Sequence, residues 1–435
     1  MSTETIGLLG IIALLTLIFL RVPVGIAMGI VGFFGYASVD GFDRALRVLG
    51  QTPYDIASGY TLSVVPLFIL MGELAMRSGM SAKLYTSARS MFLGVRGSQA
   101  LATIAACAGF GAICGSSLAT AATMTRIAIP EMRRAKYDDS LSAGSVASGG
   151  SLGILIPPSI PLVVYGLIAE QSVPRLFAGS LVPGLLLTIL YMAVALVWVM
   201  FKPNIAPQAE SDSGWSERLK NIVSAWHVML LFAVTIGGLY AGWFTPTEAA
   251  AVGAGGALIL GLAFGQLTWK GVLVSFVETV RTTCMLFVIV IFAVTFSYFV
   301  TQAQLPQAVA AWMQTLKLGH VSLIVVLTIF YIVLGCFMDG FGMILITVPV
   351  FLPVLVQNGY DPIWFGVMLV IVIELGLIHP PVGMNIFVIQ AQVPEIPITR
   401  IYKGIVPFLI APLALLALLV AIPEIVMWLP HKLFN

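Results

Sequence analysis

The chain has 435 residues, of which 59% are hydrophobic and only 9% are charged, and its mean hydropathy is +1.04. A soluble globular protein carries about 25% charged residues, so this composition excludes that class and indicates an integral membrane protein. The formal net charge is +2, and no stretch of basic residues indicates a nucleic-acid partner.

Apolar segments recur along the whole chain at about 20 residues, the length that a helix needs to cross the hydrocarbon core of a lipid bilayer. The largest polar insert, residues 202–221, is too short to form a soluble domain. We therefore expect an all-α, multi-pass protein. Ordinary spans are predicted at residues 5–20, 24–40, 53–76, 176–200, 222–242, 246–266, 271–300 and 404–429.

Residues 98–130 form an apolar segment that is too long for one upright span and too short for two. It is interrupted at CGSSLATAAT. Basic residues flank both ends: Lys83, Arg89 and Arg96 precede the segment, and Arg133, Arg134 and Lys136 follow it. Because Lys and Arg collect on the cytoplasmic side of short loops, both ends should be cytoplasmic. The segment is therefore predicted to be a re-entrant hairpin with its tip at Gly115, Ser116 and Ser117.

Two later stretches read alike: YDDSLSAGSVASGGSLGILIPPS begins at Tyr137 and YDPIWFGVMLVIVIELGLIHPPV begins at Tyr360. The offset is 360 − 137 = 223 residues, and it relates several further pairs. These pairs are Asp138 and Asp361, Leu152 and Leu375, Gly153 and Gly376, Pro157 and Pro380, and Pro158 and Pro381. A gene duplication is the simplest explanation. Each Pro-Pro pair removes two amide donors and clashes with preceding carbonyls, which predicts a helix broken inside the membrane in each half.

A second awkward segment, residues 320–357, precedes the second broken helix and is interrupted at CFMDGFGM. It has few basic neighbours, so this second hairpin should enter from the periplasm. Each half then has an odd number of crossings, which places the halves in opposite orientations. Inverted repeats with broken helices are typical of secondary transporters.

Each break in a helix leaves backbone carbonyl groups unpaired at mid-membrane depth. Unpaired carbonyls are tolerated there only where they are buried in protein or face a watery cavity. The broken helices and the hairpin tips together are expected to form two all-oxygen clusters. Such clusters suit a hard monovalent cation, and Na+ is the candidate. The predicted sodium-binding residues are Gly115, Ser116, Ser117, Ser151 and Gly153 in the first half and Asp339, Gly340, Gly342, Glu374 and Gly376 in the second.

Several charged residues in apolar segments have two interpretations. Asp339 either belongs to the functional site or caps the following helix. Arg126 either faces a substrate carboxylate or flanks the hairpin on the cytoplasmic side. Glu73 lies within a turn of Arg77 and is expected at the membrane interface, and His379 is expected to be a hydrogen-bonded structural residue.

The motifs GAICGSSLATAAT, GGSLGILIPPSIPLVVYG, MDGFGMILITVPVFLPV and ELGLIHPPVGMNIFV together resemble the large membrane subunit of the tripartite ATP-independent periplasmic (TRAP) transporters. The resemblance covers essentially the whole chain. It implies an elevator mechanism, a small four-helix membrane subunit and a periplasmic solute-binding protein as partners. It places sodium at Gly115, Ser116, Ser117, Gly153, Asp339, Gly340 and Gly376, with substrate between the two tips. His379 departs from the family pattern, which usually has Thr before Pro-Pro.

The predicted organisation divides the chain into five parts. Scaffold and first arm occupy residues 1–97, the first half of the transport domain 98–175, scaffold and second arm 176–319, the second half of the transport domain 320–400, and a final span 401–435. The tentative substrate-binding residues are Ser117, Arg126, Pro157, Pro158, Asp339, Pro380 and Pro381.

The expected function is sodium-coupled uptake of a small organic acid, such as a C4-dicarboxylate or a sugar acid, across the bacterial inner membrane. Both termini should be periplasmic, and Na+ is the coupling ion, with no other cofactor. A sodium/dicarboxylate symporter that needs no binding protein is the alternative of the same fold. An intramembrane hydrolase and a passive channel are the other classes considered. The hydrolase is disfavoured because the serines of the first tip have no histidine beside them to act as a base.

Overall fold

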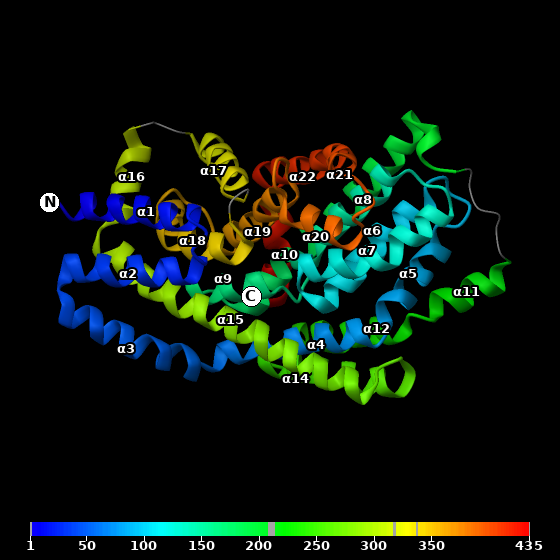
Figure 1. Ribbon diagram of the computed structural model, residues 1–435, viewed down its shortest axis with the longest axis horizontal. Helices are drawn as coiled ribbons and strands as arrows, with labels where there is room; N and C mark the ends of the chain where they lie inside the picture. Colours follow the sequence, from blue (N-terminus) through cyan, green and yellow to red (C-terminus); the bar gives the residue numbers. More distant parts are fainter. Residues whose placement is uncertain (1, 208–213, 316–318, 336–337, 435) are drawn as a thin grey trace.

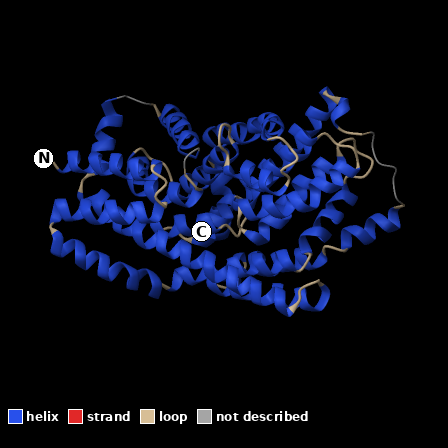
Figure 2. Cartoon of the chain, viewed as in Figure 1, coloured by secondary structure: helices blue, strands red, loops and turns tan. Residues whose placement is uncertain are grey.

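The computed structural model describes residues 2–207, 214–315, 319–335 and 338–434, and this part of the chain consists of helices and loops without a strand (Figures 1 and 2). The predicted all-α class is therefore confirmed. The helices of the first half are α1 (Thr3–Phe19), α2 (Val24–Asp40), α3 (Phe42–Ser58), α4 (Val64–Arg77), α5 (Met80–Met91), α6 (Ser98–Cys114), α7 (Ser117–Arg134), α8 (Asp139–Ser151), α9 (Ile160–Ile168) and α10 (Val173–Phe201).

The described part of the second half is divided into more helices than the first. They are α11 (Trp215–Val223), α12 (Trp226–Phe232), α13 (Gly238–Tyr240), α14 (Pro246–Phe264), α15 (Trp269–Gln302), α16 (Leu305–Thr315), α17 (His320–Gly335), α18 (Gly340–Gln357), α19 (Pro362–Ile378), α20 (Met384–Gln392), α21 (Ile398–Ile405), α22 (Ile410–Ala421) and α23 (Glu424–Phe434).

Six helical segments of the described chain are long and apolar enough to cross a membrane, or seven if the bent pair α4 and α5 counts as one span. The six are Val173–Phe201, Ser216–Tyr240, Pro246–Phe264, Trp269–Gln302, Gly340–Gln357 and Ile398–Ala421. They confirm the spans predicted between residues 176 and 300 and a multi-pass membrane protein.

Two predicted spans are wrong in their bounds. The span expected at 53–76 joins the end of α3 to α4, but α3 ends at Ser58 and a 3-10 turn separates it from Val64. The charged residues of α3 and its exposed apolar side chains mark a separate amphipathic helix. The final span, expected at 404–429, is interrupted beside Pro423, because proline cannot continue the helical hydrogen bonds.

The duplication appears in the ends of the helices. Helices α7 and α18 begin 340 − 117 = 223 residues apart, and their N-caps are Ser116 and Asp339. Helices α8 and α19 both follow an aspartate cap: Asp138 Oδ1 accepts a hydrogen bond from Ser140 N at 2.8 Å, and Asp361 Oδ1 accepts one from Ile363 N at 2.7 Å. Such caps satisfy amide donors that the first turn of a helix leaves unpaired.

The two hairpins and the two broken helices pack on one another, and α2, α4, α14 and α15 pack together beside them (Figure 1). Helix α7 packs on α8 and α20, α17 packs on α19, and α21 packs on α8. Helices from both halves of the sequence therefore pack around the breaks in the two broken helices.

The α8–α21 contact depends on two glycines. A Cβ added to Gly144 would lie 2.3 Å from the Gly404 carbonyl oxygen, closer than real Cβ atoms approach. We therefore expect Gly144→Ala to lower the free energy of unfolding by about 1–3 kcal/mol through overpacking. Thermal unfolding of the detergent-solubilised chain measures this loss. Gly255→Ala is the matched control, because a Cβ there meets no atom within 4 Å, and an equal midpoint for both variants would contradict the prediction.

Candidate functional site

The tip of the first hairpin is a sharp turn between α6 and α7. Gly115 ends α6 with φ +64°, a left-handed conformation that favours glycine, and Ser116 caps α7 by accepting a hydrogen bond from Ala119 N at 3.3 Å. The helix break predicted at Gly115, Ser116 and Ser117 is therefore confirmed. Ser117 is the first residue of α7.

This first tip lies directly on the break in the first broken helix. Helix α8 continues through the 3-10 turn Leu152–Ile154, and α9 begins after the cis Pro157–Pro158 bond. A Cβ added to Gly115 would lie 2.7 Å from the Pro158 carbonyl oxygen, and one added to Gly153 would lie 2.7 Å from the Ser116 carbonyl oxygen. The structure thus brings together the predicted residues Gly115, Ser116 and Gly153.

Thr120 belongs to the same cluster, although it was not among the predicted site residues. Its Oγ1 donates a hydrogen bond to the Ser116 carbonyl oxygen at 2.7 Å. An added Cβ on Gly153 would also lie 2.7 Å from this Oγ1. A threonine four residues after a helix-capping serine, on the same face of the helix, was the available signal.

The second tip begins with Asp339, which caps α18. Its Oδ2 accepts hydrogen bonds from Phe341 N at 3.1 Å and Gly342 N at 3.3 Å, so the capping interpretation is confirmed. Gly340 packs against Ile373 of α19. Residues 336–337 of the predicted interruption lie outside the described residues.

The second broken helix is interrupted between α19 and α20, as predicted, and contains the cis Pro380–Pro381 bond. A Cβ added to Gly335 would lie 2.8 Å from the Gly376 Cα, which brings α17 against α19 just before this break. His379 occupies the break, and its buried Nδ1 has no hydrogen-bonding partner among the described residues. The expected structural hydrogen bond of His379 is thus absent at this nitrogen.

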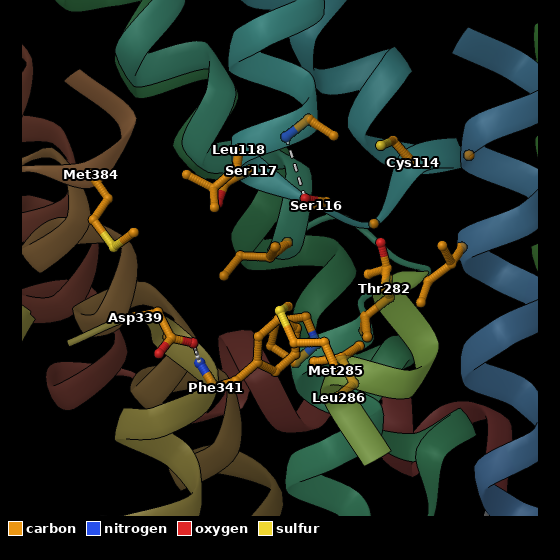
Figure 3. A pocket seen from close by; sticks show the side chains of 18 of the residues that line it. Cys114, Ser116, Ser117, Leu118, Thr282, Met285, Leu286, Asp339, Phe341 and Met384 are labelled. Atoms are coloured by element: carbon orange, nitrogen blue, oxygen red, sulfur yellow. Dashed lines mark hydrogen bonds between the residues drawn. The ribbon is translucent and has the colours of Figure 1, made fainter. Parts of the chain in front are cut away.

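Both tips face one central cavity of about 200 Å³ (Figure 3). The tips contribute Gly115, Ser116, Ser117, Leu118, Ala119, Asp339, Gly340 and Phe341; the broken helices contribute Ile154, Ile160, Pro161, Leu377 and Met384; α4, α15 and the end of α6 complete the wall with Ile69, Gly72, Glu73, Met76, Thr282, Met285, Leu286 and Cys114. Among these lining residues none is Lys, Arg or His, whereas Glu73 and Asp339 are acidic. Glu73, which was expected at the membrane interface, lines this cavity and pairs with Arg77 at 3.4 Å.

Other predicted site residues lie elsewhere. Ser151 turns away from the tip: its hydroxyl donates to the Ser148 carbonyl at 2.7 Å and lies 3.0 Å from the Tyr191 hydroxyl. The side chain of Glu374 is buried against Asn385. The four predicted prolines lie in the helix breaks and do not line the central cavity: Pro157, Pro158, Pro380 and Pro381.

Arg126 lies in a second, more open cavity between α5 and α7. Its Nε donates a hydrogen bond to Gln392 Oε1 at 2.9 Å. The same cavity is lined by Arg89, Glu131 and Arg134. The structure thus places Arg126 outside the lining of the central cavity.

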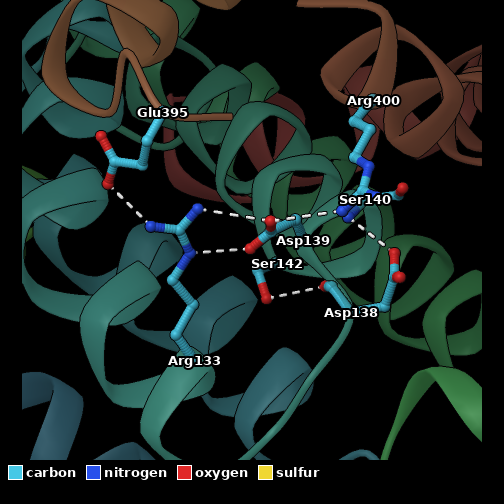
Figure 4. A network of polar contacts seen from close by, with 7 residues as sticks. All are labelled: Arg133, Asp138, Asp139, Ser140, Ser142, Glu395 and Arg400. Atoms are coloured by element: carbon cyan, nitrogen blue, oxygen red, sulfur yellow. Dashed lines mark hydrogen bonds and ion pairs between the residues drawn. The ribbon is translucent and has the colours of Figure 1, made fainter. Parts of the chain in front are cut away.

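An ionic network connects the two halves near the end of α7 (Figure 4). Arg133 Nε donates to Asp139 Oδ1 at 2.7 Å, and its Nη1 donates to Glu395 Oε1 at 2.7 Å. Arg400 Nη1 lies 3.6 Å from Asp139 Oδ2. The hydrogen bond with Asp139 raises the pKa of Arg133 above its usual value, so the guanidinium remains charged. The network connects α7 and α8 of the first half to α21 and the segment before it in the second half.

Comparison with known proteins identifies relatives along almost the whole chain. Residues 11–425 match the family model described as "Tripartite ATP-independent periplasmic transporter, DctM component". The C4-dicarboxylate TRAP transporter large permease protein DctM of Pseudomonas aeruginosa is 36% identical over 390 residues, 89% of this chain and 90% of that protein. The sialic acid TRAP transporter large permease protein SiaM of Vibrio cholerae is 32% identical over 421 residues, 96% of each chain.

Among solved structures, the YdaH transporter of Alcanivorax borkumensis has a similar fold. The TM-score is 0.60, and the match covers 87% of this chain and 88% of that chain at 16% sequence identity. At this identity the likeness concerns the fold alone.

Proposed function

Because the chain belongs to the DctM family of tripartite ATP-independent periplasmic (TRAP) transporters, we propose that it carries a small organic acid into the cell in symport with Na+. As a large permease of this family, it is a transporter and not an enzyme. The family also implies a small membrane subunit and a periplasmic binding protein as partners. We place the chain in the bacterial inner membrane with both termini in the periplasm.

The observation that carries this proposal is the meeting of the two hairpin tips at one cavity. The N-termini of α7 and α18 both reach its lining, at Ser117 and Gly340. Helix N-termini carry unpaired amide donors and a partial positive charge, which attract anions. At α18 the Asp339 carboxylate already accepts from Phe341 N and Gly342 N, and no described basic side chain lines the cavity, so the N-terminus of α7 and the Na+ ions bound at the tips would provide the positive potential for a carboxylate. Relatives named for C4-dicarboxylates and for sialic acid, which are both carboxylates, agree with this substrate class.

We assign sodium to the oxygen clusters where each tip touches its own broken helix. The first cluster comprises Gly115, Ser116 and Gly153, to which we add Thr120 because of its contacts with Ser116 and Gly153. The second comprises Asp339, Gly340, Gly342 and Gly376. Carbonyl, hydroxyl and carboxylate oxygens are the ligands that hard cations prefer. A bound ion would fix each tip against its broken helix and so shape the substrate site.

In the elevator mechanism that we propose, the two hairpins and the two broken helices move as one body. Their mutual packing and the Arg133 network support a rigid unit. Helices α2, α4, α14 and α15 would form the stationary scaffold, with α4 and α15 providing one wall of the central cavity. Residues 98–175 and 320–400 then remain the two halves of the moving domain.

Uptake into proteoliposomes tests the proposal. The purified chain with its small membrane subunit is given an inward Na+ gradient, and radiolabelled succinate or sialic acid is added with or without the periplasmic binding protein. We expect accumulation only when both the Na+ gradient and the binding protein are present. Accumulation without the binding protein would favour the sodium/dicarboxylate symporter that needs no binding protein. Equal accumulation when a K+ gradient replaces the Na+ gradient would contradict sodium coupling.

A further inference from the structure

Glu374, Asn385 and Ser117 form a buried cluster that crosses between the two halves of the chain. Glu374 lies on α19, Asn385 on α20, and Ser117 at the start of α7. Asn385 Nδ2 donates a hydrogen bond to Glu374 Oε2 at 3.3 Å, and the Ser117 side chain lies near the Glu374 carboxyl group. The exposed fractions are 3% for Glu374, 0% for Asn385 and 4% for Ser117.

Two oxygens in this cluster have no donor. Glu374 Oε1 and Asn385 Oδ1 are buried, and neither has a hydrogen-bonding partner among the described residues. Glu374 makes no ion pair with a described basic residue either. Buried acceptors are rarely left without a partner, because they lose their hydration and gain nothing in return. Two such acceptors beside one carboxyl group are suited to hold a positively charged ligand.

Glu374 and Asn385 lie apart from the two tip clusters, and only Ser117 belongs to a tip. The 223-residue offset relates Glu374 to Ser151, and Ser151 points toward Tyr191 and not toward the first tip. Glu374 likewise does not hydrogen-bond to the second tip in the described structure; its neighbour Ser117 belongs to the hairpin of the other half. The offset also relates Asn385 to Leu162, so the first half has no amide at the matching position.

We propose that Glu374, Asn385 and Ser117 form a third monovalent-cation site, separate from the two tip clusters and occupied by Na+. The ligands are a carboxylate, an amide oxygen and a hydroxyl, an all-oxygen set that selects a hard cation. A single carboxylate balances one positive charge, whereas Ca²⁺ is usually held by six to eight oxygens including several carboxylates. Among the described residues, no group of three or more His, Cys, Asp or Glu could hold a metal, which disfavours a transition metal here.

Such a site would connect the ion to the substrate through Ser117. This residue lines the central cavity and also lies near Glu374, so one side chain reaches both the central cavity and the proposed cation site. A bound cation would draw α7 of the first half toward α19 and α20 of the second. The inference rests on the proposed sodium coupling and adds an ion that bridges the two halves.

The test measures the thermal midpoint of the full chain over a range of Na+ concentrations, with K+ keeping the ionic strength constant. Once the Na+ sites are saturated, every tenfold rise in Na+ concentration raises the free energy of unfolding by the same increment for each bound ion. We expect Glu374→Gln to lose one such increment, although glutamine keeps the shape and the hydrogen bond with Asn385. Asn385→Leu, which introduces the residue found in the first half, should lose the same increment. Ser180→Ala, a buried substitution in α10 outside the site, should retain all increments.

The combination with the second tip distinguishes one site from two. Glu374→Gln together with Asp339→Asn should lose two increments, whereas a double variant no worse than either single variant would overturn the separate site. If Glu374→Gln and Asn385→Leu respond to Na+ as the natural chain does, Glu374 is a neutral hydrogen-bonding residue and the inference is wrong. If the natural chain itself responds equally to Na+ and K+, sodium coupling fails, and the proposed function fails with it.

Discussion

Asp339→Asn is expected to weaken the apparent affinity for Na+ by about 10- to 100-fold while the protein remains folded. The loss follows from removing the charge, since a hydrogen bond or contact with an ionised group contributes about 1.5–3 kcal/mol. The fold should persist because asparagine caps a helix about as well as aspartate does. Asp339→Ala removes both roles, and should in addition lower stability by about 0.5–2 kcal/mol. Initial uptake rates over a range of Na+ concentrations, with thermal midpoints in Na+ and in K+, measure both effects.

Asp361→Asn is the matched control for this prediction. Asp361 caps α19 by accepting hydrogen bonds from Ile363 N at 2.7 Å and Trp364 N at 3.2 Å, but it does not line the central cavity. Its substitution should therefore leave the Na+ affinity unchanged. If both asparagine variants weaken Na+ binding equally, or if neither does, Asp339 is a helix cap only.

The cap and the ion site do not exclude one another at Asp339. Only its Oδ2 accepts the two described amide hydrogen bonds, so Oδ1 can still contact a cation. Ser116 has the corresponding role in the first half, where Oγ caps α7 and the backbone carbonyl accepts from Thr120. In both halves the same residue starts the helix and presents oxygen at the tip.

The sequence was sufficient to predict the architecture wherever it depended on the backbone. Consecutive prolines and tip glycines interrupt a helix whatever surrounds them, so the breaks at Pro157 and Pro380 and the turn at Gly115 were found in the expected places. The repeat then predicted the second set of elements from the first. Helix α3 was missed because its polar sequence adjoins the apolar start of α4 without a proline or a charge run between them.

Side-chain directions could not be predicted in the same way. The repeat places Ser151 and Glu374 at equivalent positions, but whether such a residue points to its own tip depends on the rotation of α8 and α19 against their neighbours. Ser151 meets Tyr191 of α10, and Glu374 meets Asn385 of α20. The contact of Arg126 could not be predicted either. The sequence places Arg126 after the first tip, but only the packing of α20 on α7 shows that it contacts Gln392.

Gly153→Ala is expected to disrupt the proposed cation cluster at the first tip. The added Cβ would lie 2.7 Å from both the Ser116 carbonyl oxygen and Thr120 Oγ1, distances that real Cβ atoms essentially never show. One of these atoms is main chain, so the tip itself must move. We expect the free energy of unfolding to fall by about 1–3 kcal/mol and the sodium-specific stabilisation to fall as well. Thermal unfolding in Na+ and in K+ measures the two effects separately.

Gly29→Ala shows whether the sodium effect is a general result of overpacking. A Cβ on Gly29 would lie 2.5 Å from the Phe292 ring, a similar overlap at the α2–α15 contact, away from both tips. This variant should lose stability equally in Na+ and K+, because no ion ligand moves. Gly153→Ala should lose more stability in Na+ than in K+, since the displaced Ser116 carbonyl no longer faces the ion. If the two variants behave alike, Gly153 is needed only for packing, and the first cluster does not bind Na+.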